Sequence, residues 1–130
     1  MVYSKSQVEL VYKEDVFQIV GAAMAVHREL GCGFLEAVYQ EALEIEFRHR
    51  KIPFEPQKRF SIMYRDEQLK TYYVPDFYCF GKIIVEIKAL QKCGGVEESQ
   101  IINALKTTKM KVGLLVNFGE KSLFHKRYIL

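Results

Sequence analysis

Three charged side chains interrupt an apolar stretch in the middle of the chain, and their spacing is that of a hydrolytic site. Residues 74–89 contain two runs of Val, Ile, Tyr and Phe on either side of Gly81, a pattern typical of a β-hairpin. The charged residues are Asp76, Glu86 and Lys88. Burying a charge is costly unless the charge is paired or ligates a metal ion. These side chains therefore either face water or have a chemical role.

The hairpin loop decides whether the two acids meet. If the loop around Gly81 has an odd number of residues, Asp76 pairs with Glu86 and their Cβ atoms lie about 4.5–5.5 Å apart. A two-residue loop of Gly81 and Lys82 would instead put the two carboxylates on opposite faces of the sheet. We predict the first arrangement, with Lys88 on the same face as Glu86 because side chains alternate along a strand.

Two carboxylates so close repel each other unless a cation lies between them. Mg²⁺ prefers carboxylate and carbonyl oxygens, so we expect Asp76 and Glu86 to share one Mg²⁺ or Mn²⁺, within about 5 Å of each other. The backbone carbonyl of Ile87 is expected to complete the inner shell. Lys88 would then orient or activate the attacking water, which predicts phosphodiester hydrolysis. The alternative is a salt bridge between Lys88 and Asp76 beside an exposed Glu86.

A helix upstream supplies a further carboxylate. Residues 35–50 have an apolar stripe at helical spacing, and Glu36 falls on the flank of that stripe, where its carboxylate can look inward. Glu36 is a candidate extra metal ligand, direct or through water, or simply an acid that stabilises a helix N-terminus. Tyr39 lies one turn further on and either packs in the core or contacts phosphate or water.

The motifs resemble a known family. Pro75-Asp76 followed by Glu86-Ile87-Lys88 resembles the signature of the PD-(D/E)XK nuclease-like superfamily, and residues 33–39 (GFLEAVY) resemble the motif of its GxxExxY family. The resemblance spans about residues 16–118. It implies a restriction-endonuclease-like α-β-β-β-α-β core with an extra N-terminal helix, and Glu36 as the acid of the motif.

The resemblance also implies a contribution from a later helix. In related nucleases a Gln on the helix after the third strand approaches the metal, and here that residue is Gln100. The related pattern continues with a Tyr four residues later, where this chain has Ala104. We expect Gln100 to be an accessory residue of the site.

Length and composition indicate one globular domain over residues 1–130. The three cysteines form no CxxC pair, which argues against a structural zinc site and favours a reducing compartment. No apolar signal segment opens the chain, and the longest uncharged run, residues 16–26, is too short for a membrane span. We therefore expect a cytoplasmic protein without a membrane partner.

Charge is unevenly distributed along the chain. The net charge is +3, but residues 106–130 carry six Lys or Arg and one Glu. This basic C-terminal part, with Lys58 and Arg59, suits a polyanion such as DNA or RNA. The alternative is an ordinary solvated lysine-rich surface. A homodimer is also possible.

Hydrophobic periodicity predicts a mixed α/β fold with a central sheet flanked by helices. Helices are predicted over residues 13–30, 35–50 and 96–110, and strands over residues 60–64, 69–80, 82–89, 111–118 and 123–129, the last at a sheet edge. The sequence thus predicts a Mg²⁺- or Mn²⁺-dependent nuclease. The alternative is a nuclease-like module that binds nucleic acid or protein without cutting.

Overall fold

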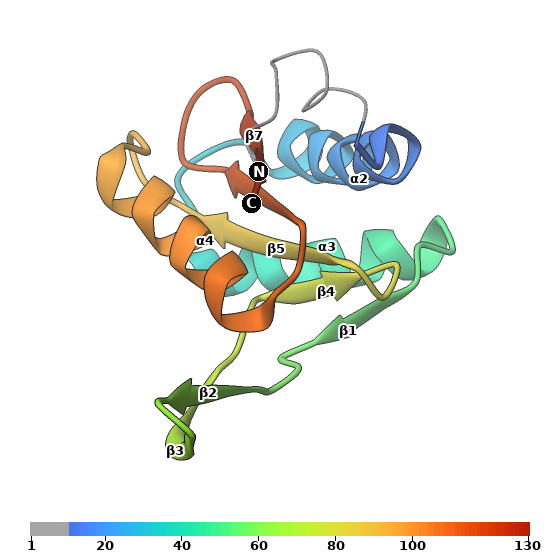
Figure 1. Cartoon of the computed structure of the whole chain (residues 1–130). Helices are drawn as coiled ribbons and strands as arrows, with labels where there is room; N and C mark the ends of the chain where they lie inside the picture. Colours follow the sequence, from blue (N-terminus) through green and yellow to red (C-terminus); the bar gives the residue numbers. More distant parts are fainter. Residues whose placement is uncertain (1–10) are drawn as a thin grey trace.

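The computed structural model describes residues 11–130. A mixed five-stranded sheet lies between helices on its two faces, and a separate two-stranded sheet projects from one end (Figure 1). The elements along the chain are α2 (Lys13–Leu30), α3 (Glu36–His49), β1 (Phe54–Pro56), β2 (Phe60–Tyr64), β3 (Glu67–Tyr73), β4 (Phe77–Cys79), β5 (Ile83–Lys88), α4 (Gly95–Thr108), β6 (Val112–Asn117) and β7 (Phe124–Ile129).

The central sheet has the order β1-β4-β5-β6-β7. Only β5 and β6 run parallel, and α4 provides the crossover between them. The other neighbours are antiparallel. As predicted, the last strand, β7, lies at an edge of the sheet.

Each face of β5 packs against a different helix layer. Ile83, Val85 and Ile87 are fully buried in the core that α2 and α3 cover. Ile84, on the opposite face, is buried in the smaller core under α4. Glu86 and Lys88 follow Ile84 in the strand alternation, so they belong to the α4 face of the sheet.

The three predicted helices are confirmed to within two residues at each end. The predicted single strand over residues 69–80 is wrong. It is divided into β3 and β4, which belong to different sheets. The break contains Pro75, which has no N–H to donate to a strand ladder and restricts Val74 before it. The short strand β1 was not predicted.

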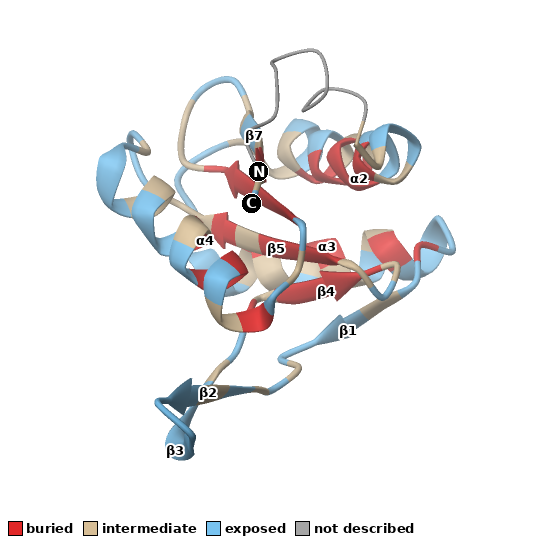
Figure 2. Cartoon of the chain, in the orientation of Figure 1, coloured by how far each residue is buried: buried red, intermediate tan, exposed pale blue. Residues whose placement is uncertain are grey.

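Strands β2 and β3 form an arm that stands away from the central sheet (Figures 1 and 2). Its residues are largely exposed, including large side chains such as Met63, Tyr64 and Tyr72. Phe60 and Tyr73, which pair at the base of the arm, pack against the core under α4. Among the described residues, no helix is long and apolar enough to cross a membrane.

Candidate active site

The hairpin between β4 and β5 has the odd loop that brings the two acids together. Phe77 pairs with Val85 and Cys79 with Ile83, which leaves three residues in the loop. Phe80 and Gly81 adopt φ values of 57° and 64°, a left-handed turn in which glycine is strain-free. One step beyond Phe77, this register places Asp76 opposite Glu86.

The backbone around Asp76 fixes its carboxylate at the end of the hairpin. The Ile87 N–H donates a hydrogen bond of 2.8 Å to Asp76 Oδ2. Gln40 of α3 donates through Nε2 to the Asp76 carbonyl at 3.2 Å, which ties the break before β4 to the helix layer. Because the N–H and C=O of a strand residue point to the same edge, the Ile87 carbonyl also points to the Asp76 side.

The neighbouring side chains have opposite effects on the pKa of Glu86. Burial, the negative charge of Asp76 and a hydrogen bond with the Asp76 side chain raise the pKa of Glu86 to about 8. The Tyr73 hydroxyl donates a hydrogen bond to Glu86 Oε1 and, together with Lys88, opposes that rise. Burial, with the adjacent Glu86, also raises the pKa of Tyr73. The hairpin register and these effects on the pKa of Glu86 both place the two carboxyl groups near each other. Their sharing of one metal ion stays a prediction.

Glu36 and Lys88 interact electrostatically with the Asp76–Glu86 pair. Partial burial and the charge of Asp76 raise the pKa of Glu36, at the start of α3, whereas Lys88 lowers it. Lys88 also lowers the pKa of Glu86. Over residues 11–130, Lys88 has no carboxylate at ion-pair distance, so the alternative of a salt bridge to Asp76 is not observed. Glu36 of α3, Asp76 in the segment before β4, and Glu86 and Lys88 of β5 thus lie near one another.

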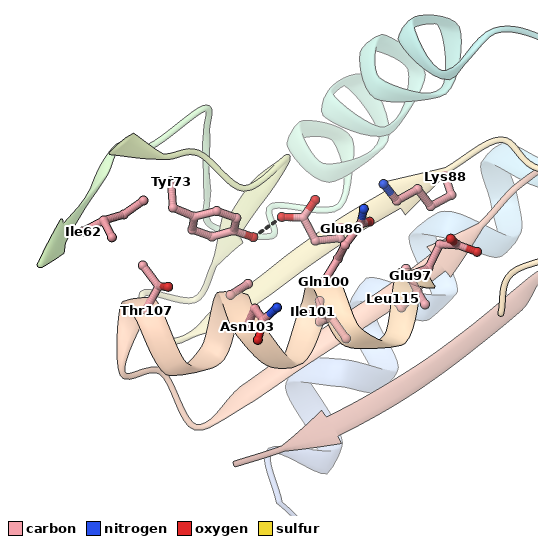
Figure 3. Close-up of a pocket in the computed structure, with 11 residues that line it drawn as sticks. Ile62, Tyr73, Glu86, Lys88, Glu97, Gln100, Ile101, Asn103, Thr107 and Leu115 are labelled. Atoms are coloured by element: carbon pink, nitrogen blue, oxygen red, sulfur yellow. Dashed lines mark hydrogen bonds between the residues drawn. The ribbon is translucent and has the colours of Figure 1, made fainter. Parts of the chain in front are cut away.

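A pocket adjoins this cluster on the α4 side. Glu86 and Lys88 form one end of it, and Gln100 of α4 faces the same space (Figure 3). The accessory role of Gln100 stays a prediction. Tyr73 reaches across from the arm toward Glu86. Sequence reasoning missed Tyr73, because it placed that residue in one continuous strand with Asp76.

Tyr39 is a core residue and not an accessory of the site. Its side chain is fully buried and stacks on Phe118 with ring centroids 4.6 Å apart. Its hydroxyl donates to the Gly31 carbonyl at 2.6 Å and accepts from the Phe34 N–H at 3.3 Å. Both bonds secure the loop before α3, which leaves Tyr39 out of reach of a phosphate.

The donor set suits a hard divalent cation. Asp76 and Glu86 present carboxylate oxygens to each other, and a cation between them would replace their mutual repulsion by attraction. In the part of the chain that the structure describes, no three His, Cys, Asp or Glu side chains are arranged as a metal site. The pair therefore fits as a two-carboxylate site, of the kind that Mg²⁺ occupies while keeping several waters.

The basic residues predicted to contact a polyanion divide into two groups. Lys126 is paired with Glu98, and Arg127 donates to the Val11 carbonyl at 2.7 Å, so both act within the fold. Lys58 lies over the Phe60 and Tyr78 rings at the base of the arm, and Arg59 lies over the Tyr72 ring.

Comparisons with known proteins bear on the family and the fold of this chain. Residues 13–128 match the family model described as the PD-(D/E)XK nuclease superfamily. The crystal structure of SSO0001 superposes with a TM-score of 0.55 at 19% identity, over 93% of this chain. The chain spans 59% of the length of SSO0001. No curated protein sequence matches the chain. The match over nearly all of the described residues establishes that this chain belongs to the PD-(D/E)XK nuclease superfamily.

Proposed function

We propose that the protein is a metal-dependent nuclease that hydrolyses phosphodiester bonds in nucleic acid. The observation that carries the proposal is the hairpin register that places Asp76 opposite Glu86, with Glu36 and Lys88 in electrostatic reach. A folded protein accommodates two partly buried carboxylates near each other only at a cost, and a cation offsets that cost. Such clusters of perturbed groups are typical of active sites.

Each residue of the cluster has a distinct role in the proposal. Asp76, Glu86 and the Ile87 carbonyl hold Mg²⁺ or Mn²⁺, and Glu36 is a further ligand, direct or through water. When bound, the ion supplies Lewis-acid stabilisation of phosphate charge and a more acidic water. Lys88 orients the attacking water and stabilises the charge that develops on the phosphate. Gln100 is an accessory that faces the same space.

The surroundings of the cluster favour nucleic acid as substrate. Lys58 lies over the half-buried Phe60 ring and Arg59 over the exposed Tyr72 ring, a combination of charge and aromatic rings that suits phosphates and bases together. The glycine, glutamate and tyrosine of residues 33–39 further favour placement in the GxxExxY family.

The test is a cleavage assay on plasmid DNA, a single-stranded oligonucleotide and RNA, each with Mg²⁺ or Mn²⁺. We expect cleavage that EDTA abolishes and that Asp76→Ala eliminates. Lys88→Ala should lower the rate by about 100-fold or more, the cost of removing one group that stabilises transition-state charge. Lys92→Ala, which changes an exposed lysine just beyond β5, is the matched control and should cleave normally. Cleavage that survives both site variants would refute the proposal.

A second candidate is a nuclease-like module that binds nucleic acid without cutting it. Within residues 11–130, the lack of a preformed cluster of three ligating side chains favours this candidate. It predicts retained nucleic-acid binding with neither cleavage nor affinity for Mn²⁺ at millimolar concentration.

A further inference from the structure

The pocket beside the carboxylate cluster has the size of a small ligand site. It lies between α4 and the base of the arm and has a volume of about 330 Å³. Pockets for small molecules start at roughly 300 Å³, so this one suits a single ring system with its attached groups. Glu86 and Lys88 close one end, so a ligand in the pocket would extend directly from the proposed phosphate position (Figure 3).

The walls of the pocket are of two kinds. Ile101, Ala104 and Leu115, all buried, give an apolar floor, and Ile62 of the arm adds an apolar side. The Tyr73 ring spans the gap between the arm and Glu86 (Figure 3). An apolar floor beside an aromatic ring favours a flat, partly apolar ligand.

The polar edge of the pocket comes from one face of α4. Gln100, Asn103 and Thr107 recur at the spacing that aligns side chains along a helix. The side-chain amides of Gln100 and Asn103 form no hydrogen bond with any other described residue. Each amide offers a donor and an acceptor side by side, the combination that pairs with the edge of a nucleobase.

Ala104 provides the space in the middle of the pocket. Its small side chain lies in the floor, 3% exposed, where a longer side chain would project toward Tyr73. The space therefore depends on the residue type at position 104.

We propose that this pocket binds a nucleobase of the substrate strand, next to the phosphate at the Asp76–Glu86 pair; the assignment rests on the proposed function. The base contacts the Tyr73 ring, and the amides of Gln100 and Asn103 contact its edge. A base can enter only when it is unpaired or has left its stack. The protein therefore prefers single-stranded or frayed nucleic acid to intact duplex.

Calorimetry with mononucleotides tests the pocket directly, because they contain no phosphodiester bond to cleave. The probes are AMP, GMP, CMP and UMP, with ribose 5-phosphate as the probe that lacks a base, all with Mg²⁺. We expect at least one nucleotide to bind about tenfold or more tightly than ribose 5-phosphate, the effect of one stacked base. Asn103→Ala and Ala104→Leu should remove that advantage. Ser99→Ala, an exposed change elsewhere on α4, should retain it.

The outcomes separate this inference from the proposed function. Equal affinity for nucleotides and ribose 5-phosphate overturns the base pocket, even where wild-type protein cleaves nucleic acid. A base-dependent affinity that Asn103→Ala and Ala104→Leu both leave intact also overturns it. A base-dependent affinity lost in Asn103→Ala, in a protein that cleaves nothing, supports the pocket and refutes the nuclease. Asn103→Ala changes an exposed side chain, so it decides the question if Ala104→Leu does not fold.

Discussion

The pKa of the Glu86 carboxyl group depends on burial and on three neighbouring side chains. Burial and Asp76 raise its pKa, whereas the Tyr73 hydroxyl and Lys88 lower it. A carboxyl group with a raised pKa in the folded state stabilises the fold at low pH, and this stabilisation is lost as the pH rises toward 8. The metal-free protein should therefore lose stability over the pH range in which Glu86 ionises, which is also the range in which Glu86 becomes able to bind a cation.

Tyr73 affects the pKa of Glu86 through one hydrogen bond. Its hydroxyl donates to Glu86 and lowers the pKa of that carboxyl group. Tyr73→Phe should raise this pKa further, so the pH at which Mn²⁺ binding reaches half its maximum should shift upward. Tyr72→Phe is the matched control, because Tyr72 is exposed on the arm and contacts Arg59. Mn²⁺ titrations across pH measure the shift, and equal profiles for the wild type and both variants would contradict this role.

At the scale of elements, the connection after β5 holds Lys88 in place. The Phe118 N–H donates to the Lys88 carbonyl at 2.8 Å. The fully buried Asn117 side chain accepts from the Leu90 N–H and donates to the Leu90 carbonyl, both at 2.9 Å. Asn117 thus joins the ends of the parallel strands β5 and β6.

Asn117→Ala should therefore affect both stability and the site. It removes the partner of three backbone groups, the N–H and carbonyl of Leu90 and the N–H of Gly119, and we expect the free energy of unfolding to fall by about 1–3 kcal/mol. Nuclease activity should fall as well, because the segment after Lys88 is released. Gln91→Ala, an exposed change in the same connection, should alter neither. Urea denaturation measures the first effect, and a stability unchanged in Asn117→Ala would contradict the argument.

The elements that follow periodicity could be predicted from sequence. The helix α2 was predicted with its observed bounds, because acidic residues begin it and Gly31, at φ 71°, ends it. The register that places Asp76 opposite Glu86 was also predictable, because a single loop length sets the register of a hairpin.

The contribution of the arm could not be predicted in the same way. Alternation along a supposed strand put Tyr72 on the face of Asp76, but the break at Pro75 cancels that phase. Tyr73 contacts Glu86, 13 residues away, because the arm folds back over α4. Pro75 indicates that a strand is interrupted, but it does not indicate where the arm before it lies relative to the central sheet. In residues 35–50, Leu35 and Ile45 fall on the apolar stripe by helical spacing but are exposed, because the buried residues of α3 are Tyr39, Leu43 and Phe47.

At the scale of the whole molecule, the arm presents a basic and aromatic surface beside the site. Part of the basic C-terminal region is used within the fold, as the Lys126–Glu98 pair shows. Lys58 and Arg59 are instead placed at the base of the arm, next to the pocket residue Tyr73. We therefore expect the arm to supply phosphate contacts.

The salt dependence of nucleic-acid binding tests whether Lys58 and Arg59, rather than Lys126, contact phosphates. Replacing both Lys58 and Arg59 by Ala should make the plot of log K for binding single-stranded DNA against log salt concentration less steep by about 1.4. This is the change expected when two phosphate contacts are lost. Lys126→Ala should leave the slope unchanged, because that lysine donates a hydrogen bond to Glu98 at 3.2 Å, whereas Lys58 lies 3.8 Å from Glu55 without a hydrogen bond to it. Fluorescence anisotropy in EDTA, where no cleavage occurs, gives both slopes. An unchanged slope in the double variant would contradict a phosphate-binding arm.

The most direct test of the central claim is calorimetric titration of the protein with Mn²⁺ at pH 6 and pH 8. Because a proton competes with the ion for Glu86, whose pKa is raised to about 8, affinity should increase from the lower to the higher pH. Glu86→Gln should weaken binding by about tenfold or more at pH 8, whereas Glu41→Gln, at an exposed position on α3, should not. Binding that Glu86→Gln leaves intact, or no binding at millimolar Mn²⁺, would contradict a metal site at the Asp76–Glu86 pair.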